Sequence, residues 1–292
     1  MSAMSATTRE IQSQPQLWRQ VAGDAVPTEL TARGQRMLVI GCGTSAFVAM
    51  AYAVLREQAG DGETDWAYGS EVALTRRYDT VVALTRSGTT TEIVEALPEI
   101  QADTKVVLTA VAGGPLSALV DHEVVLDFAD ETSVVQTRFP TTSLALLRHG
   151  LGEDLRQTII DGEHAVGDGL PVNPADFEHF VYLGTGWTIG LAHEAALKMR
   201  EAAQAWSESY PAMDYRHGPI AVAGPKSLVW MFGTPPPGLV QQVEATGATV
   251  VTSDLDPLAQ LVQAQRCAVA MADSRGLDPD QPRGLTRSVV LT

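Results

Sequence analysis

Two segments that lie half a chain apart share one pattern: a short apolar run, a Gly-x-Gly turn and then a stretch with helical spacing. The first begins with residues 37–43 and the second with residues 180–186. A short, continuous apolar run beside glycine is typical of a strand that is buried on both faces. Two such strand–loop–helix units predict a tandem duplication of one α/β unit.

More short apolar runs alternate with helical patterns in both halves of the chain. Each is expected to form a strand, and they are residues 80–85, 105–109, 123–127, 227–232, 249–252 and 268–271. Strands that alternate with helices predict parallel, doubly wound sheets, so the expected fold class is α/β. The stretch 153–174 ends in Gly, Pro and Asp, which predicts a domain junction. The expected organisation is an N-terminal segment, 1–24, and two subdomains, 25–160 and 175–292.

The composition excludes several classes of protein. The formal net charge is -15, and no basic stripe is present that could displace the counterions of a nucleic acid. Two cysteines, Cys42 and Cys267, make no disulfide framework, which fits a reducing compartment. No apolar run approaches the roughly 20 residues that a membrane-spanning helix needs. We therefore expect a cytoplasmic protein that binds neither nucleic acid nor membrane.

Hydroxyl side chains gather where the expected strand 80–85 ends. The sequence Thr85-Arg-Ser-Gly-Thr-Thr90 has four hydroxyls in six positions, just before a helix. Unpaired N–H groups at a helix start suit a phosphate, although helix capping alone also explains Ser and Thr there. Residues 41–45 form a second loop of this kind, but no later acidic residue supports a dinucleotide site. Since ligands of open α/β sheets bind at the carboxyl ends of strands, both loops are expected to converge on one ligand.

Three charged residues share one face of the expected helix 187–203. Glu194, Lys198 and Glu201 follow the i, i+4, i+7 spacing. The spacing fits a solvated stripe of ion pairs, and it fits equally a general base whose pKa is tuned by a neighbouring ammonium. His217 precedes a Gly-Pro turn and titrates near neutral pH, so it is either structural or a proton shuttle for opening a sugar ring.

These motifs occur in one order, and Asp280-Gln-Pro-Arg283 follows them. Together they resemble the sugar isomerase (SIS) family, and within it the isomerase domain of glucosamine-6-phosphate synthases, over essentially the whole chain. The resemblance implies two tandem SIS subdomains, each a flavodoxin- or Rossmann-like parallel sheet flanked by helices. It also implies a homodimer that binds a sugar phosphate. The remaining histidines show no metal-ligand spacing, and we expect neither a metal nor a cofactor.

The resemblance also assigns roles to individual residues. The residues expected to contact the sugar are Thr44, Ser45, Val134 and Gln136. Those expected to bind the phosphate are Thr85, Arg86, Ser87 and Thr90. Glu201 matches the base that forms the enediol, with Lys198 and Glu194 beside it, and His217 matches the ring-opening histidine.

Several departures from the family pattern alter the expected reaction. No glutaminase domain precedes the match, so no release of ammonia from glutamine is expected. Arg287 stands where the synthases carry a Schiff-base lysine, and a guanidinium is a poor amine nucleophile. Arg86, Thr89 and Gln136 replace Gln, Glu and Ser, and Arg86 favours a strongly anionic ligand.

The expected activity is aldose–ketose isomerisation of a hexose or amino sugar phosphate by enediol-type proton transfer. The sequence leaves open whether the amine is lost as in a deaminase, whether the chain is a fructosamine-phosphate deglycase, and whether it is a sugar-phosphate sensor without turnover.

Overall fold

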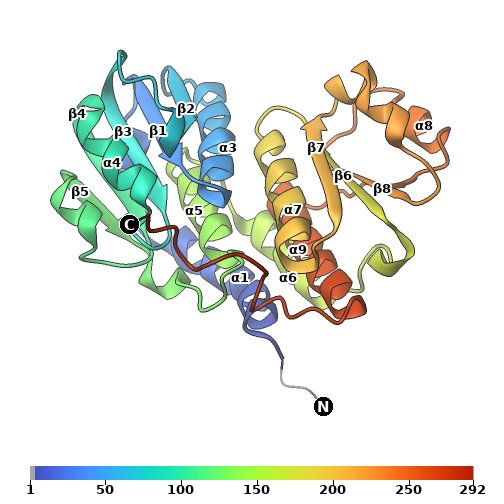
Figure 1. The fold of residues 1–292 in the computed structure, drawn as a ribbon. Helices are drawn as coiled ribbons and strands as arrows, with labels where there is room; N and C mark the ends of the chain where they lie inside the picture. The colour runs from blue at the N-terminus through green and yellow to red at the C-terminus, as the bar shows by residue number, and fades with distance from the viewer. Residues whose placement is uncertain (1–3, 292) are drawn as a thin grey trace. The chain divides into compact units, whose positions relative to one another are not determined.

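The computed structural model describes residues 4–291, and the chain folds into two compact units (Figure 1). The N-sheet unit comprises residues 16–132, 138–156 and 286–291. The C-sheet unit comprises residues 4–15, 133–137 and 157–285. Each unit thus combines segments that are distant in sequence around one parallel sheet.

The sheet of the N-sheet unit has five strands in the order β2-β1-β3-β4-β5, and every pairing is parallel. The strands are β1 (Met37–Gly41), β2 (Thr64–Tyr68), β3 (Arg77–Thr85), β4 (Gln101–Thr109) and β5 (His122–Val125). The α-helices are α2 (Thr28–Thr31), α3 (Thr44–Gln58), α4 (Thr91–Glu99) and α5 (Arg138–Gly150), and α1 (Ala6–Gly23) contributes residues to both units. The 3₁₀ turns are η1 (Gly69–Glu71), η2 (Pro115–Ala118) and η3 (Asp127–Ala129). Because β1 is buried along its whole length, its sequence reads as one apolar run.

The sheet of the C-sheet unit has four parallel strands in the order β7-β6-β8-β9. They are β6 (His179–Gly184), β7 (Trp206–Pro211), β8 (Ser227–Met231) and β9 (Thr249–Val251). The α-helices are α6 (Arg156–Gly167), α7 (Thr188–Ala203), α8 (Leu239–Glu244) and α9 (Pro257–Ser274), and the 3₁₀ turns are η4 (Pro174–Asp176), η5 (Asp214–His217) and η6 (Pro219–Val222). The sheet order and the crossover helices confirm the predicted α/β class.

One predicted strand is wrong. Residues 268–271 lie within α9, an 18-residue helix. Pro257 occupies its first turn, and the Asp256 carboxylate accepts a hydrogen bond from the Leu258 N–H, so the helix start is capped. A four-residue apolar run cannot distinguish a buried strand from the buried side of a long helix, and here the longer pattern decides.

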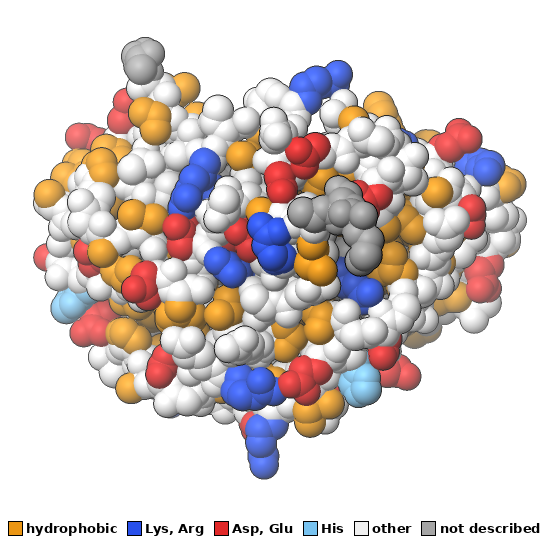
Figure 2. Space-filling view, turned by 90° about the horizontal axis from the view of Figure 1, so that it is seen from below, with side chains coloured by type: hydrophobic (Ala, Val, Ile, Leu, Met, Phe, Trp, Pro, Cys, Tyr) orange, Lys and Arg blue, Asp and Glu red, His pale blue; other side chains and the backbone are white. Residues whose placement is uncertain are grey.

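Surface charge is mixed rather than segregated on the face drawn in Figure 2, where basic and acidic side chains alternate over short distances. Among residues 4–291, no helix is both long and apolar enough to cross a bilayer.

Candidate active site

The hydroxyl loop, residues 85–90, joins the end of β3 to the start of α4 in the N-sheet unit. Gly88 has a φ of 68°, a conformation that favours glycine and lets the chain turn here. The Ser87 Oγ accepts hydrogen bonds from the Thr89 N–H at 3.3 Å and from the Thr89 Oγ1 at 3.0 Å. The Thr85 and Thr90 hydroxyl oxygens lie 3.5 Å apart. The loop therefore presents a cluster of hydroxyls beside a helix start.

A second loop lies at the same sheet edge, between β1 and α3. Because β1 and β3 are parallel neighbours, their carboxyl ends meet at one edge. A Cβ on Gly41 would lie 2.5 Å from the Ser45 carbonyl carbon, so only glycine allows this close turn into α3. Thr44 and Ser45, the first residues of α3, are almost fully buried. The structure thus brings both predicted loops to one edge of the sheet.

The C-terminal tail, residues 286–291, lies against the hydroxyl loop. The Ser288 Oγ lies 3.0 Å from the Ser87 Oγ and 2.8 Å from the Thr89 Oγ1. The buried Arg86 guanidinium donates to the Arg287 carbonyl oxygen. The family resemblance singled out Arg287 in this tail but not Ser288, which was missed as a possible contributor.

Three further contacts fix the tail in place. The Arg287 guanidinium forms an ion pair with Asp130, with one N–O distance of 2.6 Å. The Thr91 N–H donates to the Val289 carbonyl at 3.2 Å, and the Leu291 N–H donates to the Thr91 Oγ1 at 2.9 Å. No sequence signal links these residues, because about two hundred positions separate the tail from the loop.

The three charged residues of α7 meet in the C-sheet unit. The Lys198 Nζ lies 2.5 Å from a Glu201 carboxylate oxygen and 3.4 Å from a Glu194 carboxylate oxygen. The side chains of Lys198 and Glu194 are 1% and 2% exposed, whereas that of Glu201 is 18% exposed. A solvated stripe of ion pairs is therefore the wrong interpretation of this spacing. Charged side chains that are this deeply buried need partners of opposite charge, and Lys198 has two, Glu194 and Glu201.

Glu201 opens onto a cavity of about 410 Å³ in the same unit. Its lining comprises Leu197, Arg200, Glu201, Gln204, Ala205, Arg283 and Leu285. The tail motif that contains Arg283 thus lies beside the carboxylate on α7. A small molecule in this cavity can reach Glu201.

Burial shapes the titration of two neighbours on α7. Desolvation lowers the pKa of Arg200, although Glu201 and Glu194 act in the opposite direction. Desolvation, followed by the charge of Arg200, lowers the pKa of His193. The His193 Nδ1 lies 2.7 Å from the Ser209 Oγ, so this ring is a neutral hydrogen-bonding group at neutral pH.

The remaining predicted site residues also belong to the C-sheet unit. Val134 and Gln136 are half-buried, and the Gln136 Oε1 is buried without a hydrogen-bond partner in the described part of the chain. His217 ends the 3₁₀ turn η5 and is exposed, followed by Gly218 at a φ of 140°. Within residues 4–291, no ion pair or hydrogen bond joins His217 to the charged residues of α7.

The SIS domain family model matches residues 29–148. By this match, the N-terminal half of the chain is similar to a SIS domain. The chain's curated relatives include the glutamine–fructose-6-phosphate aminotransferases of Synechocystis, 26% identical, and Pyrobaculum aerophilum, 25% identical. The alignments cover 90% and 97% of this chain but 52% and 57% of the relatives, so the chain spans about half the length of these proteins.

Solved structures show the same fold over nearly the whole chain. Glucosamine-6-phosphate deaminase from Thermotoga maritima superposes with a TM-score of 0.84 at 24% identity, covering 98% of this chain and 100% of the other. Tagatose-6-phosphate ketose/aldose isomerase from Escherichia coli gives 0.78 at 19% identity, with coverages of 99% and 96%. Both sheets therefore belong to a tandem SIS fold, as the resemblance implied.

Proposed function

We propose that this chain is a phosphosugar isomerase that acts on a hexose or amino sugar phosphate by proton transfer through an enediol. The observation that carries the proposal is the Lys198–Glu201 contact at 2.5 Å, beside a cavity of about 410 Å³. A carboxylate held by a buried ammonium and open to a small molecule is equipped to act as a general base.

Glu201 would take a proton from the carbon beside the sugar carbonyl and return it to the neighbouring carbon. Lys198 would hold the carboxylate in its orientation, and the buried Glu194 would balance the charge of Lys198. His217 would shuttle the proton that opens the sugar ring. The proposed proton transfer requires one carboxylate with solvent access and one buried cation, and α7 provides both.

The hydroxyl loop would hold the phosphate. Thr85, Ser87 and Thr90 offer hydroxyls, and the start of α4 offers unpaired N–H groups. The Arg86 guanidinium, almost fully buried, adds a positive charge that favours a doubly charged anion. Thr44, Ser45, Val134 and Gln136 would contact the sugar.

The relatives support this class of substrate but do not indicate whether an amino group is retained or released. Their names refer to fructose, glucosamine and tagatose 6-phosphates. Arg287 is engaged by Asp130, and its guanidinium stays protonated, so an imine formed on this residue is not part of the proposal. Deamination of an amino sugar phosphate and cleavage of a fructosamine phosphate would both begin with this proton transfer, which converts the C–N bond to an imine. Water would then hydrolyse the imine to a carbonyl and release the amine.

Proton exchange in deuterated water tests the activity. Fructose, tagatose and glucosamine 6-phosphates are incubated with the protein, and deuterium at C1 or C2 is followed by NMR. Glu201→Gln should slow exchange by about 10²–10⁴-fold, since a positioned general base contributes that much. The matched control is Glu244→Gln on α8, which is exposed in the same unit and should leave exchange unchanged. Phosphosugar binding without exchange in the wild-type protein would instead establish a sensor.

We also propose that the protein is a cytoplasmic homodimer. The family resemblance motivates the dimer, and two free cysteines motivate a reducing compartment. Light scattering during gel filtration tests the assembly, because a dimer of this 31.1 kDa chain has twice that mass. A monomer at micromolar concentration would overturn it.

A further inference from the structure

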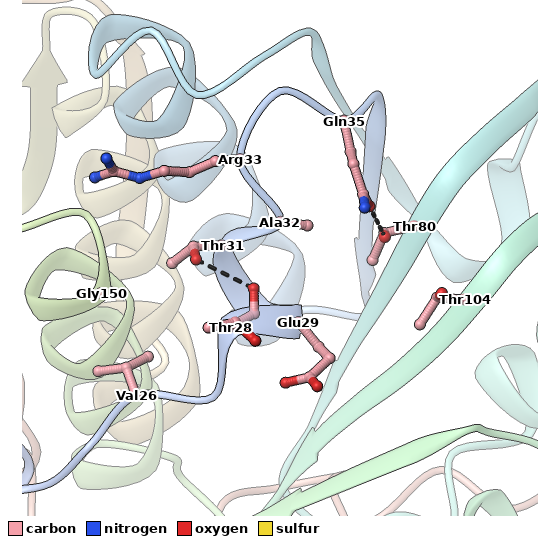
Figure 3. Close-up of a pocket in the computed structure, with 10 residues that line it drawn as sticks. All are labelled: Val26, Thr28, Glu29, Thr31, Ala32, Arg33, Gln35, Thr80, Thr104 and Gly150. Atoms are coloured by element: carbon pink, nitrogen blue, oxygen red, sulfur yellow. Dashed lines mark hydrogen bonds between the residues drawn. The ribbon is translucent and has the colours of Figure 1, made fainter.

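A second cavity opens in the N-sheet unit, at the amino ends of its strands. Its volume is about 540 Å³, within the size range of small-molecule sites. The residues that line it are Val26, Thr28, Glu29, Thr31, Ala32, Arg33, Gln35, Thr80, Thr104 and Gly150 (Figure 3). Thr80 lies five residues before Thr85 on β3, about 17 Å at the usual rise of a strand. The cavity is therefore separate from the hydroxyl loop.

One wall of the cavity is fixed by a buried arginine behind it. The five N–H donors of Arg56 are matched by five acceptors: the carbonyl oxygens of Thr31 at 2.7 Å, Ala32 at 2.5 Å, Gln35 at 3.0 Å and Gly62 at 3.3 Å, and the Thr64 Oγ1 at 2.7 Å. Three of these carbonyls belong to the segment that lines the cavity. The segment is thus held in place before any ligand arrives.

The opposite wall consists of two neighbouring strands. Thr80 of β3 pairs in register with Thr104 of β4. The Thr80 hydroxyl donates to the Gln35 Oε1 at 2.5 Å, which orients the carboxamide and leaves its amino group as a donor (Figure 3). The Thr104 hydroxyl has no hydrogen-bond partner in the described part of the chain. This wall offers hydroxyl and amide groups to a hydroxylated ligand.

The lining carries one carboxylate, Glu29, and one guanidinium, Arg33. The Glu29 side chain is 35% exposed, and its carboxylate lies 3.9 Å from the His122 Nδ1. Arg33 lines the rim, but its guanidinium lies 3.3 Å from Asp61 and points away from the Gln35–Thr80 pair (Figure 3). A carboxylate without a neutralising arginine attracts cations and repels phosphates.

We propose that this cavity binds a small amine that carries several hydroxyl groups and no phosphate. Glu29 would pair with the ammonium group. Thr104 and the Gln35 amide would exchange hydrogen bonds with the hydroxyls. The site is independent of the proposed isomerase activity, since it lies at the opposite edge of the sheet and selects against the phosphate on which that activity depends.

Isothermal titration with unphosphorylated glucosamine tests the proposal. Glucosamine should bind, whereas glucose, which lacks the ammonium, and glucose 6-phosphate, which adds an anion, should bind at least tenfold more weakly at this site. Glu29→Gln should weaken glucosamine binding at least tenfold, and Thr104→Val should weaken it several-fold. The matched control is Glu99→Gln, an exposed carboxylate on α4 of the same unit, which should change nothing.

Two results would overturn the proposal. One is the absence of glucosamine binding with a Kd below about 10 mM. The other is equal binding by the wild-type protein and Glu29→Gln, with unchanged thermal melting showing that the variant is folded. Ser87→Ala separates this site from the hydroxyl loop: it should leave glucosamine binding intact whatever its effect on phosphosugars.

Discussion

Replacing Arg56 with methionine should destabilise the N-sheet unit far more than the loss of an ordinary surface arginine. Arg56 is fully buried, and each of its five N–H groups donates a hydrogen bond. Methionine fills similar space but removes all five hydrogen bonds. The Ala32 carbonyl keeps the Gln35 N–H as a donor and the Gly62 carbonyl keeps the Thr64 hydroxyl, whereas the Thr31 and Gln35 carbonyls lose the bond from Arg56. Removing one partner of a buried charged network costs about 3–5 kcal/mol, although removing the desolvated charge offsets part of the gross loss.

The expected loss is a large share of the total stability of about 5–15 kcal/mol of a typical protein. At about 2–4 °C per kcal/mol, the melting temperature should fall by roughly 6–20 °C. Arg56→Lys keeps the charge but has only three donors, so it should recover about half of the loss. Urea denaturation followed by circular dichroism measures both variants.

The matched control is Arg77→Met. The Arg77 side chain is 65% exposed and forms an ion pair with Asp103, so its loss should cost less than about 1 kcal/mol. A cost for Arg56→Met as small as that of the control would refute the reasoning. Full stability in Arg56→Lys would also refute it, because three donors cannot serve five acceptors.

Three further predictions follow from other contacts. Burial raises the pKa of Asp280, but hydrogen bonds from residues of α1 outweigh it and lower the pKa overall. Asp280→Asn should therefore cost stability at pH 7, and denaturation should show that cost vanish as the pH falls below about 4, whereas a pH-independent cost contradicts the argument. Asp130→Asn should speed hydrogen exchange at the Leu291 amide by up to about fivefold, since the lost ion pair is partly exposed; unchanged exchange would mean that the pair does not hold the tail. Gly41→Ala should cost about 1–3 kcal/mol in thermal melting, because its Cβ would meet the Ser45 backbone at 2.5 Å, and a silent variant would show that this turn can relax.

The central strands and the edge strands β5 and β9 could be predicted from the sequence, whereas the edge strands β2 and β7 could not. β1, β6 and β8 are buried along almost their whole length, so their residues are continuously apolar. β2 and β7 lie at the edges of their sheets and carry polar residues, such as Asp65 and Glu208, among aromatic ones. Partial exposure removes the apolar run by which a buried strand is recognised.

The candidate site, too, could be predicted from the sequence only in part. Helical spacing placed Glu194, Lys198 and Glu201 on one face, and the contacts of Lys198 confirm that placement. Spacing could not indicate burial, because the same charges would fit a solvated surface. The contact of Ser288 with the hydroxyl loop depends on long-range packing, which no local pattern reports. The roles assigned to the site residues stay predictions.

The way each unit draws on distant stretches of chain has a consequence for biosynthesis. The N-sheet unit takes residues 286–291 from the very end of the described chain, and the C-sheet unit takes residues 4–15 from its beginning. Synthesis must therefore pass residue 285 before the C-sheet unit has all its parts, and residue 291 before the N-sheet unit does. Fragments cut at the midpoint of the gene would each lack a piece encoded by the other, so co-expressed halves should accumulate better than either half alone.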